Sequence, residues 1–259
     1  MDLAGNTAFL ARQMLLLELR QGQCVDMPGG VLSWGERLWA GIWNPQAFGD
    51  PERFITSTRE EAARRGVDWA GAIVIASVAS APVEQDLSDA FFVYGMPEAT
   101  GPPEYSPKVI LALTTSPALK PARGLTAELA ELDSADAAPL LKTAAASGDR
   151  LLGPALAADA VMADSQAVLL RAEGKPAGLA LLAQAGPLAR LELLWVEPDL
   201  RGRGGGGMLL AHAWEHARRA GCLALTAWAQ REGSLRYYLA RRGFTESGWA
   251  SHFLAVQPA

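Results

Sequence analysis

The sequence predicts an α/β fold of two domains in tandem, each a mixed, mostly antiparallel sheet flanked by helices. Three observations lead to this prediction. The chain of 259 residues is long for one hydrophobic core and suits two domains of about 110–140 residues. Short apolar runs typical of strands are interspersed with helical stretches. The order strand, loop, helix and strand occurs in both halves.

The boundary between the domains is predicted from a proline-containing segment. Thr115–Arg123 (TSPALKPAR) shows little apolar periodicity and separates two predicted strands. We interpret it as the linker. The predicted domains are therefore residues 1–118 and 124–259.

The second half predicts the order β-α-β-β-β-α-β-α-β. It begins with a strand at Leu125–Glu131 and a helix that Ser134 caps. The other elements are strands at Ala167–Ala172, Ala177–Gln184 and Ala189–Val196, a helix at Gly206–Ala220, a strand at Leu223–Ala229, a helix at Gly233–Arg242 and a strand at Phe244–Val256.

The first half contains a similar run of elements. Ile42–Ile55 passes from a strand through a proline into a helix that ends at Glu60–Gly66, and the strand Ala72–Val78 follows. In the second half, Leu194–Gly204 leads into a helix ending at Glu215–Gly221 in the same way. The shared order indicates a duplication, although any α/β chain contains strand-loop-helix-strand units.

Composition and charge exclude several classes of function. The chain has 23 Lys and Arg against 28 Asp and Glu, a net charge of -5, which argues against a general nucleic-acid or membrane-surface binder. No run approaches the ~18 apolar residues of a membrane span, and the N-terminus lacks the basic start of a signal peptide. We therefore expect a cytoplasmic protein without nucleic-acid or membrane partners. A homodimer is compatible with the sequence.

No metal site is expected. His212 and His216 stand four residues apart on a predicted helix, a spacing that metal ligands use, but no acidic or thiol side chain joins them. We interpret them as surface histidines. Cys24 and Cys222 lie far apart without partners at metal-ligand spacing, so buried free thiols are expected.

The strongest local signal for function is the loop Arg201–Gly207 (RGRGGGG), between a strand and an apolar helix. Its glycines allow a ligand to approach the backbone closely. The first turn of the following helix presents unpaired N–H groups and the positive end of the helix dipole. Arg201 and Arg203 add donors suited to phosphate. The loop therefore predicts a pyrophosphate site, and a flexible surface turn is the alternative.

A dinucleotide-binding motif is a competing interpretation, because Gly202, Gly204 and Gly207 fit G-x-G-x-x-G. That motif normally follows its strand at once and has an acidic residue about 20 positions later. Here Glu197–Leu200 intervenes after the strand, and the next strand ends in Gln230. The fit to a dinucleotide site is therefore weak.

The run Leu191–Leu210 resembles motif A of the GNAT superfamily of N-acetyltransferases, whose loop reads Arg/Gln-x-x-Gly-x-Gly/Ala. Arg201, Gly204 and Gly206 stand at those positions. Ser234–Phe244 is similar to motif B, in which a helix bearing a tyrosine runs into Gly-Phe.

The resemblance covers residues 125–256 and implies a GNAT domain with a splayed pair of strands. The first domain looks like a degenerate GNAT-like copy, because its loop Gln46–Arg53 lacks the glycines and is less basic. On this basis the chain is expected to hold its cofactor only in the second domain.

The resemblance implies an enzyme that moves an acetyl group from acetyl-CoA, its co-substrate, to a primary amine by direct attack in a ternary complex. The acceptor would be a small-molecule or peptide amine, whose identity the sequence leaves open. Coenzyme A would lie between the splayed strands, its pantetheine arm along one strand edge and its pyrophosphate at the loop. The residues implied for binding it are Trp195, Val196, Glu197, Arg201, Gly202, Arg203, Gly204, Gly205, Gly206 and Gly207.

The tyrosine of motif B is displaced in this chain. In the family it protonates the departing thiolate and stands four residues before the glycine of Gly-Phe, where this chain has Leu239. Tyr238 takes the role if one residue is inserted, and Tyr237 is the alternative. Both tyrosines could instead only pack or cover the helix.

The general base is less clearly marked. Some members place a glutamate on the strand after motif A, where this chain has Thr226. Glu192 on the preceding strand is the candidate, since alternation puts it on the face of Leu194 and Val196. An ordinary charged strand residue is the alternative. Because both catalytic positions depart from the pattern, a non-catalytic acyl-CoA-binding or regulatory module is the second hypothesis for function.

Overall fold

The computed structural model describes residues 23–27, 30–34, 37–42, 51–76, 104–118, 122–146 and 165–254. Contacts divide the chain into two compact units, one of Met1–Ile110 with Ser247–Ala259 and one of Leu111–Glu246. This division differs from the predicted boundary at both ends of the second unit. That unit begins before the predicted linker, and the end of the chain lies with the first unit.

The first unit contains a mixed sheet. Its strands run in the order β1-β2-β3-β4-β11-β5, with β5 and β11 each extending into the second unit. Pairing is antiparallel from β1 to β3, parallel between β3 and β4, and antiparallel between β4 and β11. The elements are β1 (Gln23–Met27), β2 (Gly30–Trp34), β3 (Arg37–Ile42), α2 (Pro51–Arg65), β4 (Asp68–Ala76), β5 (Glu104–Leu113) and β11 (Thr245–Leu254).

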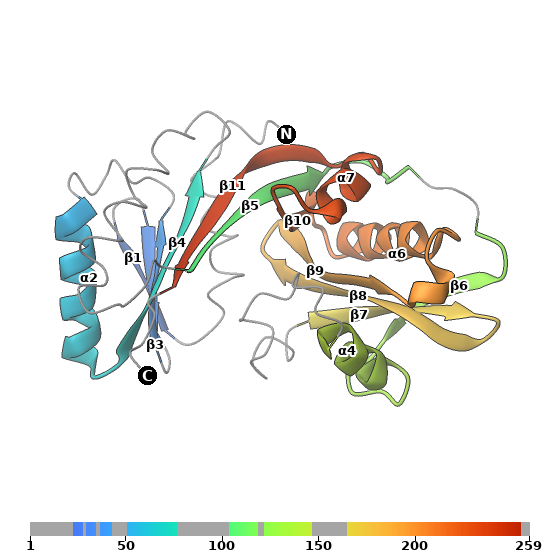
Figure 1. Cartoon of the computed structure of the whole chain (residues 1–259), viewed down its shortest axis with the longest axis horizontal. Helices are drawn as coiled ribbons and strands as arrows, with labels where there is room; N and C mark the ends of the chain where they lie inside the picture. The colour runs from blue at the N-terminus through green and yellow to red at the C-terminus, as the bar shows by residue number, and fades with distance from the viewer. Residues whose placement is uncertain are drawn as a thin grey trace. The chain divides into compact units, whose positions relative to one another are not determined.

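Helix α2 covers one face of this sheet (Figure 1). Phe54, Thr58 and Ala62 recur at intervals of four residues and are all buried, as expected for the inward stripe of an amphipathic helix. Phe54 and Ala62 pack with a cluster of strand residues, Leu32, Leu38, Ala40, Ile42 and Ala72. The predicted helix and the strand that follows it are therefore confirmed. The predicted loop Gln46–Arg53 lies mostly outside the described residues.

The second unit also contains a mixed sheet, in the order β5-β10-β9-β8-β7-β6. Pairing is antiparallel from β6 to β9 and parallel between β9 and β10. Helices α4 and α6 lie on opposite faces of β7–β9 (Figure 1). The elements are β6 (Leu125–Ala130), α4 (Ala137–Ala146), β7 (Ser165–Ala172), β8 (Lys175–Ala185), β9 (Leu188–Val196), the 3₁₀ helix η5 (Pro198–Leu200), α6 (Gly205–Arg219), β10 (Ala224–Gln230) and α7 (Ser234–Ala240).

The predicted α/β fold class, mixed sheets flanked by helices, is confirmed. The two units also share one crossover. In the first, β3, α2 and β4 form a parallel pair joined by a helix. In the second, β9, α6 and β10 do the same.

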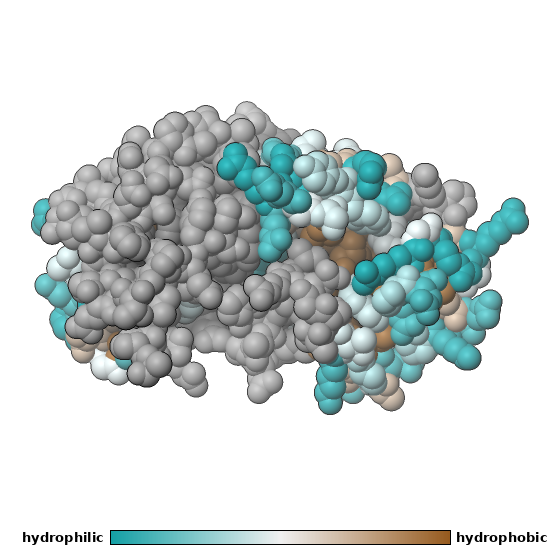
Figure 2. Space-filling model, in the orientation of Figure 1, coloured by the Kyte–Doolittle hydropathy of each residue, from teal (hydrophilic) through white to brown (hydrophobic). Residues whose placement is uncertain are grey.

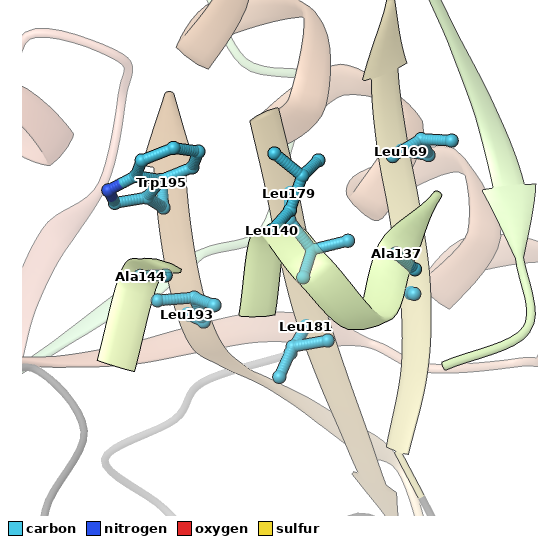
Figure 3. Close-up of a cluster of buried hydrophobic side chains, with 9 residues drawn as sticks. Ala137, Leu140, Ala144, Leu169, Leu179, Leu181, Leu193 and Trp195 are labelled. Atoms are coloured by element: carbon cyan, nitrogen blue, oxygen red, sulfur yellow. The ribbon is translucent and has the colours of Figure 1, made fainter. Parts of the chain in front are cut away.

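Helix α4 begins as the sequence predicts. The Ser134 hydroxyl accepts a hydrogen bond from the Ala137 N–H at 3.2 Å, which satisfies one of the free donors of the first turn. The helix then packs on the sheet through Ala137, Leu140 and Ala144. Figure 3 shows these side chains facing strand residues Leu169, Leu179, Leu181, Leu193 and Trp195.

We expect Leu181→Ala to lower the free energy of unfolding by about 2–5 kcal/mol, because it removes a side chain from this core and leaves a cavity. Leu181 is fully buried. Leu129→Ala on β6 is the matched control, since Leu129 is 52% exposed and the change should stay within about 0.5 kcal/mol. Urea denaturation of both variants measures the difference, and equal losses would contradict the core assignment.

Hydrophilic residues dominate the coloured surface in Figure 2, and hydrophobic residues show mainly as small areas between them. Among the described residues, the large hydrophobic side chains that remain exposed are Val25, Leu129, Leu223 and Tyr237. Most apolar side chains of the described chain are thus used in its cores.

Within the described residues, no helix is both long and apolar enough to cross a membrane. The same residues contain no group of three side chains suited to hold a metal ion. Both cysteines are free, as predicted. Cys222 is buried, but Cys24 is exposed, so the prediction of two buried thiols is wrong for Cys24, which lies on the exposed strand β1.

Candidate functional site

Strands β9 and β10 are paired over only part of their length. Parallel pairing joins Leu188–Leu191 of β9 to Ala224–Ala227 of β10. Beyond these residues β9 continues to Val196 and β10 to Gln230, with no further pairing between these two described strands. The predicted splayed strand pair is therefore confirmed, and one edge of β9 is left open at its end.

A β-bulge in β9 lies where the two strands part. On β8, the neighbours Leu181 and Leu182 pair with Leu193 and Leu191, so Glu192 is an extra residue in β9. A bulge bends its strand and increases the local twist. The bulge thus gives a physical reason why β9 turns away from β10 at this point.

The bulge bears on the predicted orientation of Glu192. Regular alternation would put Glu192 on the face of Leu194 and Val196, and the extra residue interrupts that alternation. Glu192 pairs with Arg190, two residues earlier, through bonds of 2.8 and 3.1 Å to its two carboxylate oxygens. The two side chains are only 7% and 5% exposed. Its role as a base remains a prediction.

Two further polar residues belong to this region. The Arg190 guanidinium lies 5.2 Å from the ring centre of Trp228 on β10. The Thr226 hydroxyl is buried and donates to the Ala189 carbonyl at 3.1 Å. The Thr226 side chain thus links β10 to β9 by a hydrogen bond. Some family members have a glutamate at this position.

The glycine loop passes from η5 into α6. Gly202 and Gly204 have φ angles of 79° and 92°, a region that favours glycine. The first helical hydrogen bond of α6 runs from the Met208 N–H to the Gly204 carbonyl at 3.1 Å. The N–H groups of Gly205–Gly207 have no carbonyl four residues earlier within the helix, so at the helix N-terminus they can bind a ligand.

Gly205 lets the first turn of α6 lie close on the sheet. A Cβ on Gly205 would stand 2.6 Å from Leu170 Cδ2 and 3.6 Å from Val196 Cγ1. The sequence predicts a ligand-binding role for this glycine, and the structure adds a packing role. The N-terminus of α6 thus lies directly beside the end of β9.

The two arginines of the loop are exposed. The Arg201 Nε donates to the Val196 carbonyl at 3.0 Å, which ties the loop to the end of β9. Arg203 follows in the turn before α6. Their positive charges lie close in the chain to the N–H groups of the first turn of α6.

The backbone of β9 presents its groups alternately to its two neighbours. The Glu197 N–H donates to the Ala177 carbonyl at 3.0 Å and so belongs to the β8 side. In an antiparallel pair, neighbouring residues direct their N–H groups to opposite edges of the strand. The N–H of the preceding residue, Val196, therefore points away from β8, toward the unpaired edge of β9. The Trp195 side chain lies in the core beneath α4.

Helix α7 brings Tyr238 to the first turn of α6. An ideal Cβ on Gly206 would lie 2.7 Å from the Tyr238 hydroxyl. The hydroxyl is buried and has no hydrogen-bond partner among the described residues. Burial raises the pKa of Tyr238, and the nearby positive charge of Arg242 partly opposes this shift.

The neighbouring residues of α7 occupy different environments. Tyr237 is 56% exposed and Leu239 is fully buried. Of the two candidate tyrosines, Tyr238 is the one whose hydroxyl lies against Gly206. Leu239, at the position where the family has its tyrosine, is a core residue.

Arg242 is a site residue that the sequence analysis did not identify. Its guanidinium lies 5.2 Å from the ring centre of Tyr238 and 3.6–3.7 Å from a Cβ placed on Gly207. The only sequence signal is its place in the Arg-Arg pair before Gly243, which does not show which arginine faces the loop.

The pairing of strands excludes the dinucleotide-binding interpretation. That motif belongs to a mainly parallel, doubly wound sheet, whereas β6–β9 are antiparallel neighbours and the strand before the loop, β9, has one antiparallel and one parallel neighbour. The glycine loop thus follows a strand whose end is no longer paired with its parallel neighbour.

Solved structures share this fold. A GCN5-related N-acetyltransferase from Kribbella flavida is 18% identical with a TM-score of 0.64, over 98% of this chain and 96% of that chain. A functionally unknown conserved protein from Staphylococcus epidermidis is 10% identical with a TM-score of 0.61, over 91% and 94%. A GCN5-related N-acetyltransferase from Sphaerobacter thermophilus is 15% identical with a TM-score of 0.54, over 89% and 79%. At these identities the likeness concerns the fold.

The family follows from the sequence of the second unit. No curated protein matches the chain. The model of the Acetyltransferase (GNAT) family matches residues 139–244, a range that contains the split strands, the glycine loop and Tyr238. Residues 139–244 therefore form a domain of the acetyltransferase (GNAT) family.

Proposed function

We propose that the second unit transfers the acetyl group of acetyl-CoA to a primary amine. The observation that carries the proposal is the position of the first turn of α6. That turn lies against Val196 at the open edge of β9 on one side and against the Tyr238 hydroxyl on the other. A strand edge, an anion site and a proton donor thus meet around one space.

The donor groups at the loop suit a pyrophosphate. The N–H groups of Gly205–Gly207 lie at the positive end of the 15-residue helix α6, where anions bind favourably. Arg201 and Arg203 add two positive charges with several N–H donors. The Val196 N–H at the open edge is suited to pair with the amide-rich arm of coenzyme A or with the thioester oxygen.

In the proposed acetyl transfer, Val196 and Tyr238 have different roles. Acetyl-CoA supplies a thioester, whose carbonyl carbon the neutral acceptor amine attacks to form the new C–N bond. The Val196 N–H stabilises the negative charge that develops on the carbonyl oxygen. As the C–S bond breaks, Tyr238 gives its proton to the departing sulfur. The excess proton on nitrogen passes to water, and Tyr238 regains a proton from solvent.

The acceptor is proposed to be a small-molecule or peptide amine. The chain's net charge of -5 is compatible with a cationic amine approaching from solution. The first unit is proposed to be a degenerate copy without a cofactor cleft. In support, β3 pairs with β4 along its whole length, from Arg37 to Ile42, so β3 has no unpaired end within the described strand, unlike β9.

Calorimetric titration of the full chain with acetyl-CoA tests the proposal, followed by a thiol-release assay with polyamines, amino acids, aminoglycosides and peptide N-termini. Micromolar binding with turnover of at least one acceptor is the expected result. Binding without turnover on any acceptor would instead favour the non-catalytic acyl-CoA-binding module. Absence of binding would remove the acetyltransferase proposal.

A further inference from the structure

We infer that Gly206 is a positioning residue for Tyr238: its missing Cβ is what allows the Tyr238 hydroxyl to lie in the first turn of α6. The inference rests on the proposed function for its catalytic consequence. The contact itself is a property of the fold and can be measured without substrate.

The distances around Gly206 show how little room the contact leaves. A Cβ on Gly206 would lie 2.7 Å from the Tyr238 hydroxyl oxygen, 3.3 Å from Cζ and 3.9 Å from Cε1. The first distance is shorter than real Cβ contacts allow. An alanine at this position therefore has to displace the hydroxyl group.

The Tyr238 ring also contacts Arg242. The Arg242 guanidinium lies 5.2 Å from the centre of the Tyr238 ring. Arg242 is anchored to Ala118, whose carbonyl accepts from its Nη1 at 3.0 Å and whose N–H donates to its backbone carbonyl at 3.1 Å. The buried side chain of Leu239 fixes the next position of the helix. A shift of the Tyr238 ring would therefore also change its contact with the Arg242 guanidinium.

The spacing of the tyrosine explains why glycine is needed here. In the GNAT pattern that the loop resembles, this position accepts either glycine or alanine. In this chain the tyrosine stands one residue earlier than in the family, five residues before Gly243. The displaced tyrosine reaches the loop only by direct contact with the backbone at Gly206.

Displacement of the hydroxyl has a catalytic consequence under the proposed function. A general acid acts within hydrogen-bond reach of the atom that it protonates. A misplacement of about 1 Å can cost on the order of 10²-fold in rate. Gly206 would thus affect kcat through Tyr238, while its own N–H, which alanine retains, still serves the phosphate.

A double-mutant cycle tests the inference with Gly206→Ala, Tyr238→Phe and the double variant. We expect Gly206→Ala to lower kcat at least tenfold and to lower Tm, with the Kd for acetyl-CoA changed less than threefold. In the Tyr238→Phe background, which lacks the clashing oxygen and leaves Cζ at 3.3 Å as the nearest ring atom, Gly206→Ala should lower kcat and Tm much less. Such coupling is the sign of direct interaction between two residues.

Gly207→Ala is the matched control for the Tm cycle. It adds a Cβ to the same turn, but at an ordinary distance of 3.6–3.7 Å from the Arg242 guanidinium. Its effect on Tm should be the same in both backgrounds.

Three outcomes separate the possibilities. Additive Tm effects of Gly206→Ala and Tyr238→Phe would overturn the contact. Coupled Tm effects with an equal loss of kcat in both backgrounds would overturn the positioning role. If the Tm effects are coupled but the wild-type protein neither binds acetyl-CoA nor transfers its acetyl group, the contact stands. The proposed function is then overturned, and the catalytic role of Gly206 with it.

Discussion

Tyr238→Phe should lower kcat for acyl transfer by about 10²-fold or more, the usual contribution of a positioned general acid. The Kd for acetyl-CoA should change less than threefold, because the hydroxyl is proposed to act on the departing sulfur, whereas backbone N–H groups and the loop arginines are proposed to bind the phosphates. Steady-state kinetics with a thiol-detecting reagent and calorimetric titration measure the two quantities. Equal losses in kcat and in affinity would contradict the assignment.

Tyr237→Phe is the matched control. It removes the same hydroxyl one residue earlier on α7, from a side chain that is 56% exposed. We expect its kcat to stay within about twofold of the wild-type value, since more than half of the Tyr237 side chain is exposed to solvent. If Tyr237→Phe carried the loss instead, the proton donor would be the other tyrosine.

The dependence on pH gives Tyr238 a second signature. Burial raises its pKa above the ordinary value of 10.0, so the proton stays in place through neutral and mildly alkaline pH. The wild-type kcat should fall only as pH rises above this value, and Tyr238→Phe should lack that decline. The linked stability has the same sign. It is present below the unfolded pKa near 10.0 and is lost as pH rises through the folded one.

Arg201→Ala combined with Arg203→Ala should weaken acetyl-CoA binding by tenfold or more, a cost of about 1.4 kcal/mol. Both guanidinium groups belong to the loop before α6, where the pyrophosphate is proposed to bind. The loss should shrink at high salt, because ions screen exposed charges. Calorimetric titration at two ionic strengths measures it.

The matched control removes two positive charges elsewhere. Arg64→Ala with Arg219→Ala changes the net charge equally at side chains that are 70% and 76% exposed, and Arg219 stands at the opposite end of α6. We expect its Kd for acetyl-CoA to stay within about twofold of the wild-type value. A similar loss in both double variants would show that overall charge, and not the loop, determines affinity.

Local patterns in the sequence were sufficient to predict the elements of the second unit. Ser134 marks the start of α4 through a bond to the Ala137 N–H. The Gly206–Ala220 prediction differs from the observed α6 by one residue at each end. These features depend on residues close together in the chain, where spacing, caps and glycines carry the information.

Features that depend on partners far away in the chain could not be predicted. The bulge at Glu192 exists because of its register with β8, and a single strand read alone gives only regular alternation. Arg242 reaches Tyr238 because Ala118, more than a hundred residues earlier, holds it. The assignment of residues 247–259 to the first unit likewise depends on pairing with β4.

The choice between Tyr237 and Tyr238 is an intermediate case. The motif leaves the position of an inserted residue open, because Leu239 stands where the tyrosine is expected. In the structure α7 ends at Ala240, and Gly243 adopts a φ of 96° before Phe244. Leu239 is buried in the core, and the hydroxyl of Tyr238 lies against Gly206, so the structure distinguishes the candidates where the motif does not.

The bulge in β9 also bears on the thermodynamics of ligand entry. The residues on both sides of Glu192 pair with β8, so this pairing fixes the position of the bulge in β9. The unpaired edge of β9 at Val196 is therefore preorganised, and a ligand that pairs with it need not first break hydrogen bonds between β9 and β10. Binding therefore does not include the free-energy cost of separating the strands, which favours a higher affinity. Association should accordingly resemble docking into a rigid groove, with little change in backbone amide exchange along β9 outside the contacted edge.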